Sequence, residues 1–322
     1  MKTYDLRKLN SLAKEFNYNR DSLEKVLRLT TFLKLFNTHE QLKGKYVLKG
    51  GTAINLCLFD LPRLSVDIDL NFNGDYSKEE MEKIRALHNK IITEEALLRG
   101  YTVSPKSRFT FSLDSYLLQY TNAVGGNDYI KLELNYSNRI QLLVPVIYKT
   151  QTTIIESLEI LALNKVELYA SKIAALIGRT TARDIFDVYQ MNEQKMINKN
   201  EFSLLRKLTL FYLVLSNEFE PLDTLLNRAR INIKNINFHH IKRNLIPMLK
   251  VGTKIDINKY KNDVLLFIDK LFVLTPQEAK FMDLYNSGKL EASLLLDDEI
   301  AAKANKHPMA KWKVKVRTNE EK

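Results

Sequence analysis

The sequence predicts an α+β fold in two parts, a mixed αβ domain over residues 1–150 and a helical domain over residues 151–322. Three observations support this division. Short apolar segments with alternating polar residues, typical of strands, are concentrated in the front half. Apolar residues at steps of three and four, typical of helices, dominate from about residue 155 onward. The chain of 322 residues is long enough for two domains, and 45% of it is hydrophobic, which is enough for a sizeable core.

Helices are expected before, between and after the predicted strands in the sequence. Asp21 with Glu24 suggests the capped start of a second helix within residues 6–40. Ser77 with Glu80 has the pattern of a capping box, which predicts that a long helix begins there. The expected helical ranges are 6–40, 52–59, 77–99, 164–178, 182–194, 199–216, 236–249, 259–273 and 276–287.

Strands are expected where apolar residues alternate or form short runs. Gly125-Gly126 marks a turn between two such segments, which predicts an antiparallel hairpin. The expected strand ranges are 46–48, 64–72, 109–113, 129–136 and 142–148.

Composition narrows the classes of function. The chain has 49 Lys and Arg residues against 38 Asp and Glu, a formal net charge of +11, which favours a polyanionic partner such as nucleic acid. A single cysteine, Cys57, rules out an internal disulfide and fits a reducing cytoplasm. No run of 18 apolar residues predicts a transmembrane helix, and residues 1–7 lack the apolar core of a signal peptide. We therefore expect a cytoplasmic protein with no membrane partner.

The first chemical motif is a pair of carboxylates on a predicted strand. Asp67 and Asp69 are two residues apart, so on a strand they point to the same face. Two carboxylates with no basic residue between them repel each other unless they share a cation. A hard divalent ion such as Mg²⁺ or Mn²⁺ suits oxygen ligands of this kind. The pair therefore predicts a metal site that serves phosphate chemistry.

Gly50-Gly51 follows a short apolar strand and directly precedes a predicted helix. A glycine turn at a helix start lets backbone N–H groups approach a phosphate closely. The hydroxyls of Thr52 and Ser65 are candidates for further nucleotide contacts. Each feature alone is common on ordinary proteins, whereas the order strand, Gly-Gly, helix and Asp-x-Asp strand is much more specific.

The second motif lies on the first predicted helices of the back half. Lys172, Ala175, Arg179 and Arg183 fall at steps of three and four, so on a helix they lie near one face. Asp184 and Asp187 follow closely. This pattern is usually a salt-bridged helix surface. In the functional interpretation the cations bind NTP phosphates, and one of the two aspartates, Asp184 or Asp187, holds them in place.

Together the two motifs resemble the AbiEii/AbiGii family of nucleotidyltransferase toxins, found in type IV toxin–antitoxin and phage abortive-infection systems. The first motif matches at Lys49-Gly50-Gly51-Thr52 and at residues 63–69. The second matches at Lys172, Ala175, Arg179, Arg183, Asp184 and Asp187, and departs at Met191, where leucine is usual. The resemblance covers roughly residues 45–195.

The resemblance implies a nucleotidyltransferase fold of the polymerase beta-like type and a magnesium-dependent transfer from an NTP. It implies an RNA acceptor, with the 3′ end of tRNA as the favoured one, and an antitoxin encoded nearby that need not touch the toxin. Carried over by position, Asp67 and Asp69 would bind metal, and Gly51 and Ser65 would contact the triphosphate. Lys172 would hold phosphate, and Asp187 would be an essential acidic residue.

A third carboxylate comes from a later strand in the wider nucleotidyltransferase superfamily. Glu133 is the candidate here, because it alternates with Ile130, Leu132 and Leu134 and so points away from the apolar face. An exposed strand glutamate is more often only solvated. Its role as the third metal ligand is therefore a prediction that depends on the first motif.

Two basic segments are candidates for acceptor contact. Residues 228–261 contain nine basic residues against Asp256 alone, and the tail holds Trp312 among lysines at 303–317. The alternative for both is a solvated helix face. Two other functions remain open at this point: transfer to a protein or small-molecule acceptor, and RNA binding without catalysis.

Overall fold

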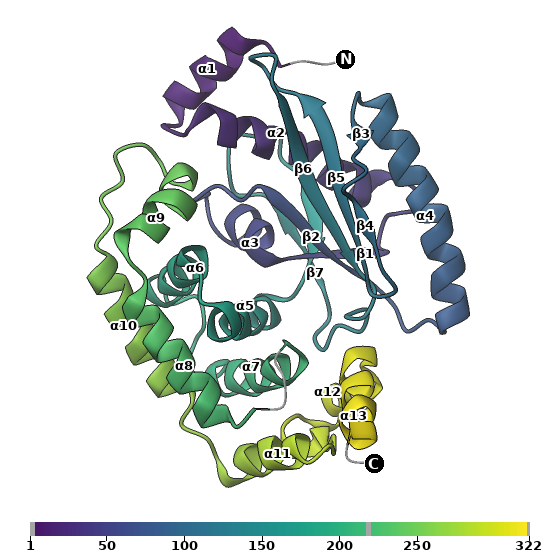
Figure 1. Ribbon diagram of the computed structural model, residues 1–322, viewed down its shortest axis with the longest axis vertical. Helices are drawn as coiled ribbons and strands as arrows, with labels where there is room; N and C mark the ends of the chain where they lie inside the picture. The colour runs from purple at the N-terminus through teal and green to yellow at the C-terminus, as the bar shows by residue number, and fades with distance from the viewer. Residues whose placement is uncertain (1–3, 217–219, 321–322) are drawn as a thin grey trace. The chain divides into compact units, whose positions relative to one another are not determined.

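The computed structural model describes residues 4–216 and 220–320 (Figure 1). Of residues 1–7, which the sequence predicts not to form a signal peptide, the first three lie outside the described residues. The chain divides into two compact units. Unit 1 comprises residues 1–139, 145–163 and 247–253, and unit 2 comprises residues 140–144, 164–246 and 254–322. A mixed sheet in one unit and helices in both confirm the predicted α+β class.

Unit 1 is built around the sheet. Its helices are α1 (Leu6–Glu15), α2 (Arg20–Thr38), α3 (Gly50–Ala53), the π-helical turn η1 (Ile54–Leu58) and α4 (Lys78–Leu98). Its strands are β1 (Tyr46–Lys49), β2 (Asp67–Phe72), β3 (Thr102–Val103), β4 (Arg108–Phe109), β5 (Leu113–Thr121), β6 (Asn127–Asn135), β7 (Val146–Lys149) and β8 (Glu159–Ala162).

The strands follow the order β3-β5-β6-β2-β1-β8-β7, with β4 paired to β5. β1 with β2, β5 with β6 and β7 with β8 are antiparallel, whereas β2 with β6 and β1 with β8 are parallel. The hairpin of β5 and β6 turns around Gly125, as the sequence predicts. β2 therefore lies in the interior of the sheet, between β1, which is antiparallel to it, and β6, which is parallel to it.

One face of the sheet is apolar, and α2 and α4 cover it. Tyr46 of β1 meets Phe36 of α2 edge-on, with ring centroids 5.1 Å apart, and its hydroxyl lies 3.0 Å from Nδ1 of His88 on α4. Phe72 and Tyr136 complete this aromatic core. Because side chains alternate along a strand, the residues between these buried ones face the opposite side of the sheet. That side carries the polar residues described below.

Unit 2 is helical. Its elements are α5 (Lys165–Arg179), α6 (Ala182–Glu193), α7 (Phe202–Ser216), α8 (Leu222–Asn235), α9 (Phe238–Asn244), η2 (Ile246–Met248), α10 (Ile257–Leu271), α11 (Pro276–Asn286), η3 (Ala292–Leu294), α12 (Asp298–Lys306) and α13 (Pro308–Glu320), with η2 continuing into unit 1. α5 packs against α6, α7 and α8, and α6 packs against α10. In the described part of the chain, no helix is both long and apolar enough to span a membrane.

A buried carboxylate ties residues 140–144 into unit 2. Glu167 of α5 accepts hydrogen bonds from the backbone N–H groups of Leu142 and Leu143, at 2.9 and 2.8 Å. The hydroxyl of Tyr212 on α7 donates a third bond at 2.6 Å. Burial raises the pKa of Glu167, and these donors partly oppose that rise.

Several local predictions are confirmed and others are wrong. Ser77 and Glu80 form the predicted capping box of α4. Asp21 is not the cap of α2, because the side chain of Asn19 accepts the N–H groups of Asp21 and Ser22 instead. The strand predicted at 64–72 begins only at Asp67. The segment predicted as a strand at 109–113 is mostly a turn between β4, which ends at Phe109, and β5, which begins at Leu113. β8, α8, α12 and α13 were not predicted.

Candidate functional site

The Asp-x-Asp pair lies on β2, next to a matching strand. Ile68 and Leu70 are buried, so Asp67 and Asp69 point to the other face of the sheet. The parallel register with β6 places Asp67 beside Lys131 and Asp69 beside Glu133. The three acidic residues chosen from the sequence are therefore neighbours on one face of adjacent strands.

Cations partly balance this group of carboxylates. The Nζ of Lys131 lies 2.7 Å from Oε1 of Glu133, and the hydroxyl of Ser115 on β5 donates to the same oxygen at 3.3 Å. Burial raises the pKa of Glu133, but the contact with Lys131 outweighs it and holds that pKa below its usual range. Lys49 stands opposite Asp69 in the register of β1 and β2.

The Asp69 carboxyl is strongly affected by its surroundings. Its removal from water raises its pKa to about 6, and the charges of Glu133 and Asp67 add to the rise. Lys49 opposes this effect. An acidic group with a raised pKa is one that a further cation would stabilise in its charged form, so the site is suited to bind positive charge.

The donor chemistry fits a divalent cation, since three carboxylates supply the oxygen ligands that Mg²⁺ and Mn²⁺ prefer. Among the described residues, however, no three Asp, Glu, His or Cys side chains already stand in a metal-holding arrangement. The Glu133 carboxyl lies against the amine of Lys131 and also meets the carboxyl of Asp69. Asp67 and Asp69 remain the candidates for metal ligands. A ligand role for Glu133 stays a prediction.

The two glycines bring backbone against these side chains. Gly50 has φ +72°, in the left-handed region, and a Cβ there would lie 2.6 Å from Oδ2 of Asp69. A Cβ on Gly51 would lie 2.6 Å from Nη2 of Arg63 and 2.9 Å from Oγ of Ser65. Another residue at Gly50 would be strained by its φ and would displace the Asp69 carboxylate, and a Cβ at Gly51 would displace the Arg63 or Ser65 side chain. The start of α3 therefore lies directly against the carboxylate group and the Ser65 loop.

Thr52 has a structural contact that the sequence did not suggest. Its buried hydroxyl donates to the carbonyl oxygen of Asp67, which ties α3 to the start of β2. The side-chain amide of Asn55 donates to the carbonyl of Gly51 at 2.8 Å. These bonds fix the glycine turn. A contact between Thr52 and a nucleotide stays a prediction, as does one from the buried Ser65.

The loop before β2 is held by residues distant in sequence. The N–H of Leu64 donates to the carbonyl of Met248 at 2.6 Å, and the N–H of Val251 donates to the carbonyl of Asn17 at 2.5 Å. The hydroxyl of Tyr18 donates to the carbonyl of Leu61, which has φ +43°. Residues 247–253 thus return from the helical part of the sequence to support the loop that carries Arg63 and Ser65.

The second motif forms a buried ion cluster in unit 2. Lys172 of α5 reaches two carboxylates of α6, with Nζ 2.7 Å from Oδ1 of Asp184 and 2.6 Å from Oδ2 of Asp187. All three side chains are buried. Arg179 approaches Oδ2 of Asp184 at 2.9 Å, although 64% of its side chain is exposed. The motif is therefore more than a solvated helix face.

The turn between α5 and α6 sets this geometry. Thr180 has φ +44°, an unusual conformation for a β-branched residue. Thr181 caps α6 by accepting the N–H of Asp184, and its hydroxyl donates to Oδ2 of the same residue at 2.7 Å. Burial alone would raise the pKa of Asp184, but Lys172 and Arg179 outweigh it and hold that pKa far below its usual range. Asp184 is thus a charged anchor for Lys172. The predicted phosphate contact of the half-buried Arg183 stays a prediction.

The candidate residues therefore form two groups, each described within its own unit. The group in unit 1 comprises Gly50, Gly51, Thr52, Ser65, Asp67, Asp69 and Glu133, and the group in unit 2 comprises Lys172, Arg179, Arg183, Asp184 and Asp187. Sequence reasoning missed Lys49, Arg63, Ser115 and Lys131 as parts of the site. Lys49 and Arg63 lie inside the stretches that match the family motif, and Lys131 lies two residues before Glu133 and so shares its strand face, so each of these three had a usable signal.

The basic segment 228–261 is less positive in the fold than in the sequence. Arg228 lies 2.8 Å from Glu220, and Arg230 lies 2.8 Å from Asp269. Both carboxylates are outside the segment, so a count along the sequence could not include them. In the tail, Trp312 lies on α13 with 58% of its surface exposed. RNA contact by either segment stays a prediction.

Comparison of the sequence with protein-family models identifies the family of this chain. The model described as "Nucleotidyl transferase AbiEii toxin, Type IV TA system" matches residues 32–267. The chain belongs to this family. It is therefore a nucleotidyltransferase enzyme and a toxin of the type IV toxin–antitoxin class, as its two motifs predict. The match spans both groups of candidate residues.

A solved structure shows the same fold over nearly the whole chain. It is the MenT4 nucleotidyltransferase toxin of Mycobacterium tuberculosis H37Rv, at a TM-score of 0.61 and 14% sequence identity. The match covers 97% of this AbiEii chain and 98% of MenT4. No curated protein sequence matches the chain. At this identity the likeness to MenT4 concerns the fold.

Proposed function

We propose that this AbiEii toxin transfers a nucleoside monophosphate from an NTP to the 3′ end of an RNA, with tRNA as the favoured acceptor, and so blocks translation. The observation that carries the proposal is the group of Asp67, Asp69 and Glu133 on adjacent strands, with the backbone of Gly50 against Asp69. The excess of basic residues in the chain favours a polyanionic acceptor over a cationic small molecule.

In the proposed reaction, an oxygen of the acceptor 3′ hydroxyl forms a bond to the α-phosphorus of the NTP. The bond from that phosphorus to the bridging oxygen breaks, and pyrophosphate leaves. The hydroxyl proton passes to a carboxylate of the site or to water. Such a transfer needs mainly positioning and charge neutralisation. A divalent cation, Mg²⁺ or Mn²⁺, held by Asp67 and Asp69 would supply charge neutralisation and would acidify the attacking hydroxyl.

The protein groups have separate tasks in this proposal. The backbone at Gly50 and Gly51 lies where phosphate oxygens can approach it closely, because neither residue has a Cβ. Lys172 supplies a point charge for phosphate, and Asp184 and Asp187 hold its amine in position. Since Asp187 contacts Lys172 directly, its loss would affect the position of that amine.

The biological setting follows the same proposal. The substrates, NTP and tRNA, are cytoplasmic, and we assign the toxin to that compartment. A cognate antitoxin encoded nearby would restrain it, with no need for direct contact. A function in defence against phages is part of this proposal, since the family also occurs in abortive-infection systems.

The test is nucleotide transfer in vitro. Purified protein is incubated with total bacterial RNA, Mg²⁺ or Mn²⁺, and each α-labelled NTP separately, and the products are separated on a denaturing gel. We expect a labelled band of tRNA size. Asp67→Asn should abolish it, whereas the control Asp60→Asn, which changes an exposed carboxylate of the same unit, should not. Label in a protein band, or no labelled RNA with any NTP, would refute the RNA acceptor.

A further inference from the structure

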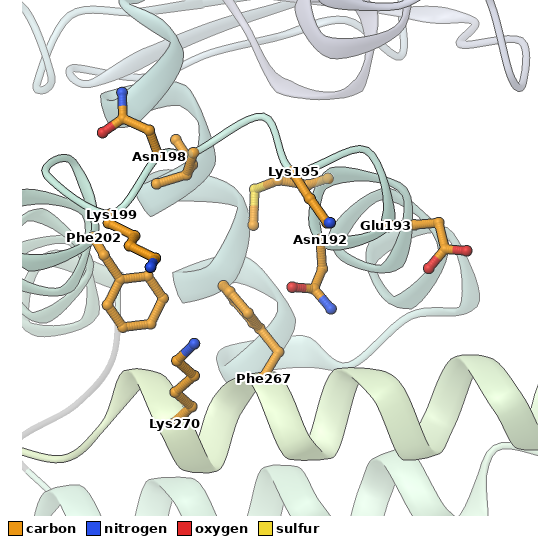
Figure 2. Close-up of a pocket in the computed structure, with 10 residues that line it drawn as sticks. Asn192, Glu193, Lys195, Asn198, Lys199, Phe202, Phe267 and Lys270 are labelled. Atoms are coloured by element: carbon orange, nitrogen blue, oxygen red, sulfur yellow. The ribbon is translucent and has the colours of Figure 1, made fainter.

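Unit 2 contains a cavity of about 920 Å³ that the proposed reaction does not use (Figure 2). It lies between the end of α6, the 194–201 loop, the start of α7 and α10. Lys195, Lys199 and Lys270 line it together with Phe202 and Phe267. Its volume is within the range of small-molecule binding sites.

The charge of this cavity is positive. Glu193 is the one carboxylate among the described residues that line it, and its Oε1 lies 3.3 Å from Nζ of Lys259, outside the lining. The nearby Glu201 is held by Lys165, at 2.9 Å. In the part of the chain that the structure describes, Lys195, Lys199 and Lys270 form no ion pair with any carboxylate. Their three ammonium groups therefore favour an anionic ligand.

The cavity also offers aromatic surface. The rings of Phe202 on α7 and Phe267 on α10 meet edge-on, with centroids 6.3 Å apart. Nζ of Lys270 lies 5.3 Å from the centroid of the Phe202 ring, so a cation and a ring already share one side of the cavity (Figure 2). Aromatic rings beside basic groups are the combination that binds unpaired bases together with their phosphates.

The position of the cavity relates it to the second motif. Asp184 stands in the first turn of α6 and Glu193 at its end, a separation of about 14 Å along the helix axis at 1.5 Å per residue. One helix therefore carries part of the Lys172 cluster at its start and one wall of the cavity at its end.

We propose that this cavity binds an unpaired nucleotide of the RNA acceptor. The base would lie against Phe202, whose ring packs edge-on on the buried Phe267, and the flanking phosphates would contact Lys195, Lys199 and Lys270. The inference rests on the proposed RNA acceptor and adds a second RNA contact to it. An acidic peptide would also meet the lysines but would make no comparable use of the two rings. Nucleic acid is therefore the ligand that accounts for both features.

The test measures binding of a fluorescent single-stranded RNA of about twelve nucleotides to the full-length protein by anisotropy, at several salt concentrations. The double variant Lys195→Ala/Lys199→Ala is compared with Lys83→Ala/Lys280→Ala, which removes two exposed lysines elsewhere. Each phosphate contact on a single strand contributes about 0.7 to the slope of log K against log salt. The cavity variant should bind more weakly, with a slope shallower by about 1.4, whereas the control should keep the wild-type slope.

A third variant, Phe202→Leu, keeps apolar volume but removes the ring. It should weaken RNA binding by about tenfold and leave the salt slope unchanged, because stacking releases no counterions. NTP binding, measured on the same proteins, should not change in any of the three variants. Weaker NTP binding together with a lower melting temperature would indicate damage to the fold, and would overturn the assignment of a local RNA contact.

The outcomes separate this inference from the proposed function. If wild-type protein binds RNA and the cavity variant matches the control, the cavity is not an RNA site, although RNA remains the acceptor. If the wild-type protein binds NTP but no RNA, the proposed acceptor fails and this inference fails with it. If oligoglutamate of equal charge displaces RNA as well as unlabelled RNA does, and Phe202→Leu has no effect, the cavity is a site for acidic peptide.

Discussion

The substitution Gly50→Ala tests whether the glycine turn is part of the catalytic geometry. At φ +72° an alanine costs about 1–2 kcal/mol in backbone strain. Its Cβ would also lie 2.6 Å from Oδ2 of Asp69, where ordinary van der Waals contact begins at 3.4 Å. About 0.8 Å of overlap must therefore be relieved, and β2 is held by β1 on one side and β6 on the other. We expect the Asp69 carboxylate to move.

Gly44→Ala is the matched control. Gly44 has φ +75°, so the backbone strain is the same, but a Cβ there meets no atom within 4 Å. Both variants should lose about 1–2 kcal/mol of unfolding free energy in urea titrations. Since a displacement of about 1 Å in a catalytic group costs on the order of 100-fold in rate, only Gly50→Ala should lose transfer activity on that scale.

The assay is the initial rate of labelled NMP incorporation into RNA, measured where both variants are fully folded. A Gly50→Ala rate within about threefold of the Gly44→Ala rate would refute the reasoning, because the overlap with Asp69 would then have no catalytic effect. Equal loss of activity in both variants would attribute the effect to backbone strain alone.

Three further perturbations test other parts of the structure. Lys172→Ala leaves two buried carboxylates without their shared cation and should lower the unfolding free energy, measured in urea, by about 3–5 kcal/mol. The double variant Lys172→Ala/Asp184→Asn should recover part of this loss, because it removes one of the two charges. No recovery would mean that the unpaired charge is not the cause. Tyr212→Phe removes one of the three hydrogen-bond donors to Glu167 and should lower the unfolding free energy by about 1.5–3 kcal/mol in the same titration. An unchanged unfolding free energy would show that water replaces the hydroxyl. Burial lowers the pKa of His88 from its ordinary value of 6.5 to about 4. As the pH falls, the unfolded chain is therefore protonated at this residue before the folded chain is. The contribution of His88 to stability is complete above pH 6.5 and is lost as the pH falls toward 4. His88→Gln, which does not titrate, should lose less stability between pH 7 and pH 5, and an identical loss would contradict this account.

The chemical core of the site could be predicted from sequence because it depends on local periodicity. Asp67 and Asp69 share a face of β2 by strand alternation alone, and Glu133 was found in the same way on β6. The step that sequence could not supply is strand register. Lys49 stands opposite Asp69 only because β1 pairs with β2 antiparallel in one particular register, and nothing near Lys49 in the sequence indicates this.

The missed elements have physical reasons of the same kind. β8 is four residues long; it pairs antiparallel with β7 along its length and, at Ala162, parallel with Leu48 of β1, more than 100 residues earlier. Its neighbours in sequence carry no alternation that would reveal it. The basic segment 228–261 appeared strongly charged because its partners Glu220 and Asp269 lie outside it and meet it only in the folded chain. Non-local pairing thus contributes to both errors.

The path of the chain has a consequence for how this toxin can be divided. A break at residue 150 would remove β8, leaving β1 with an open edge, and would also remove the 247–253 segment whose Met248 accepts the N–H of Leu64. The Arg63 and Ser65 loop would lose that support. Neither half of the gene therefore encodes a complete sheet together with a supported Arg63 and Ser65 loop. Exchange of halves between related toxins should fail unless both parts come from the same parent, so recombination within this family is expected to transfer whole genes.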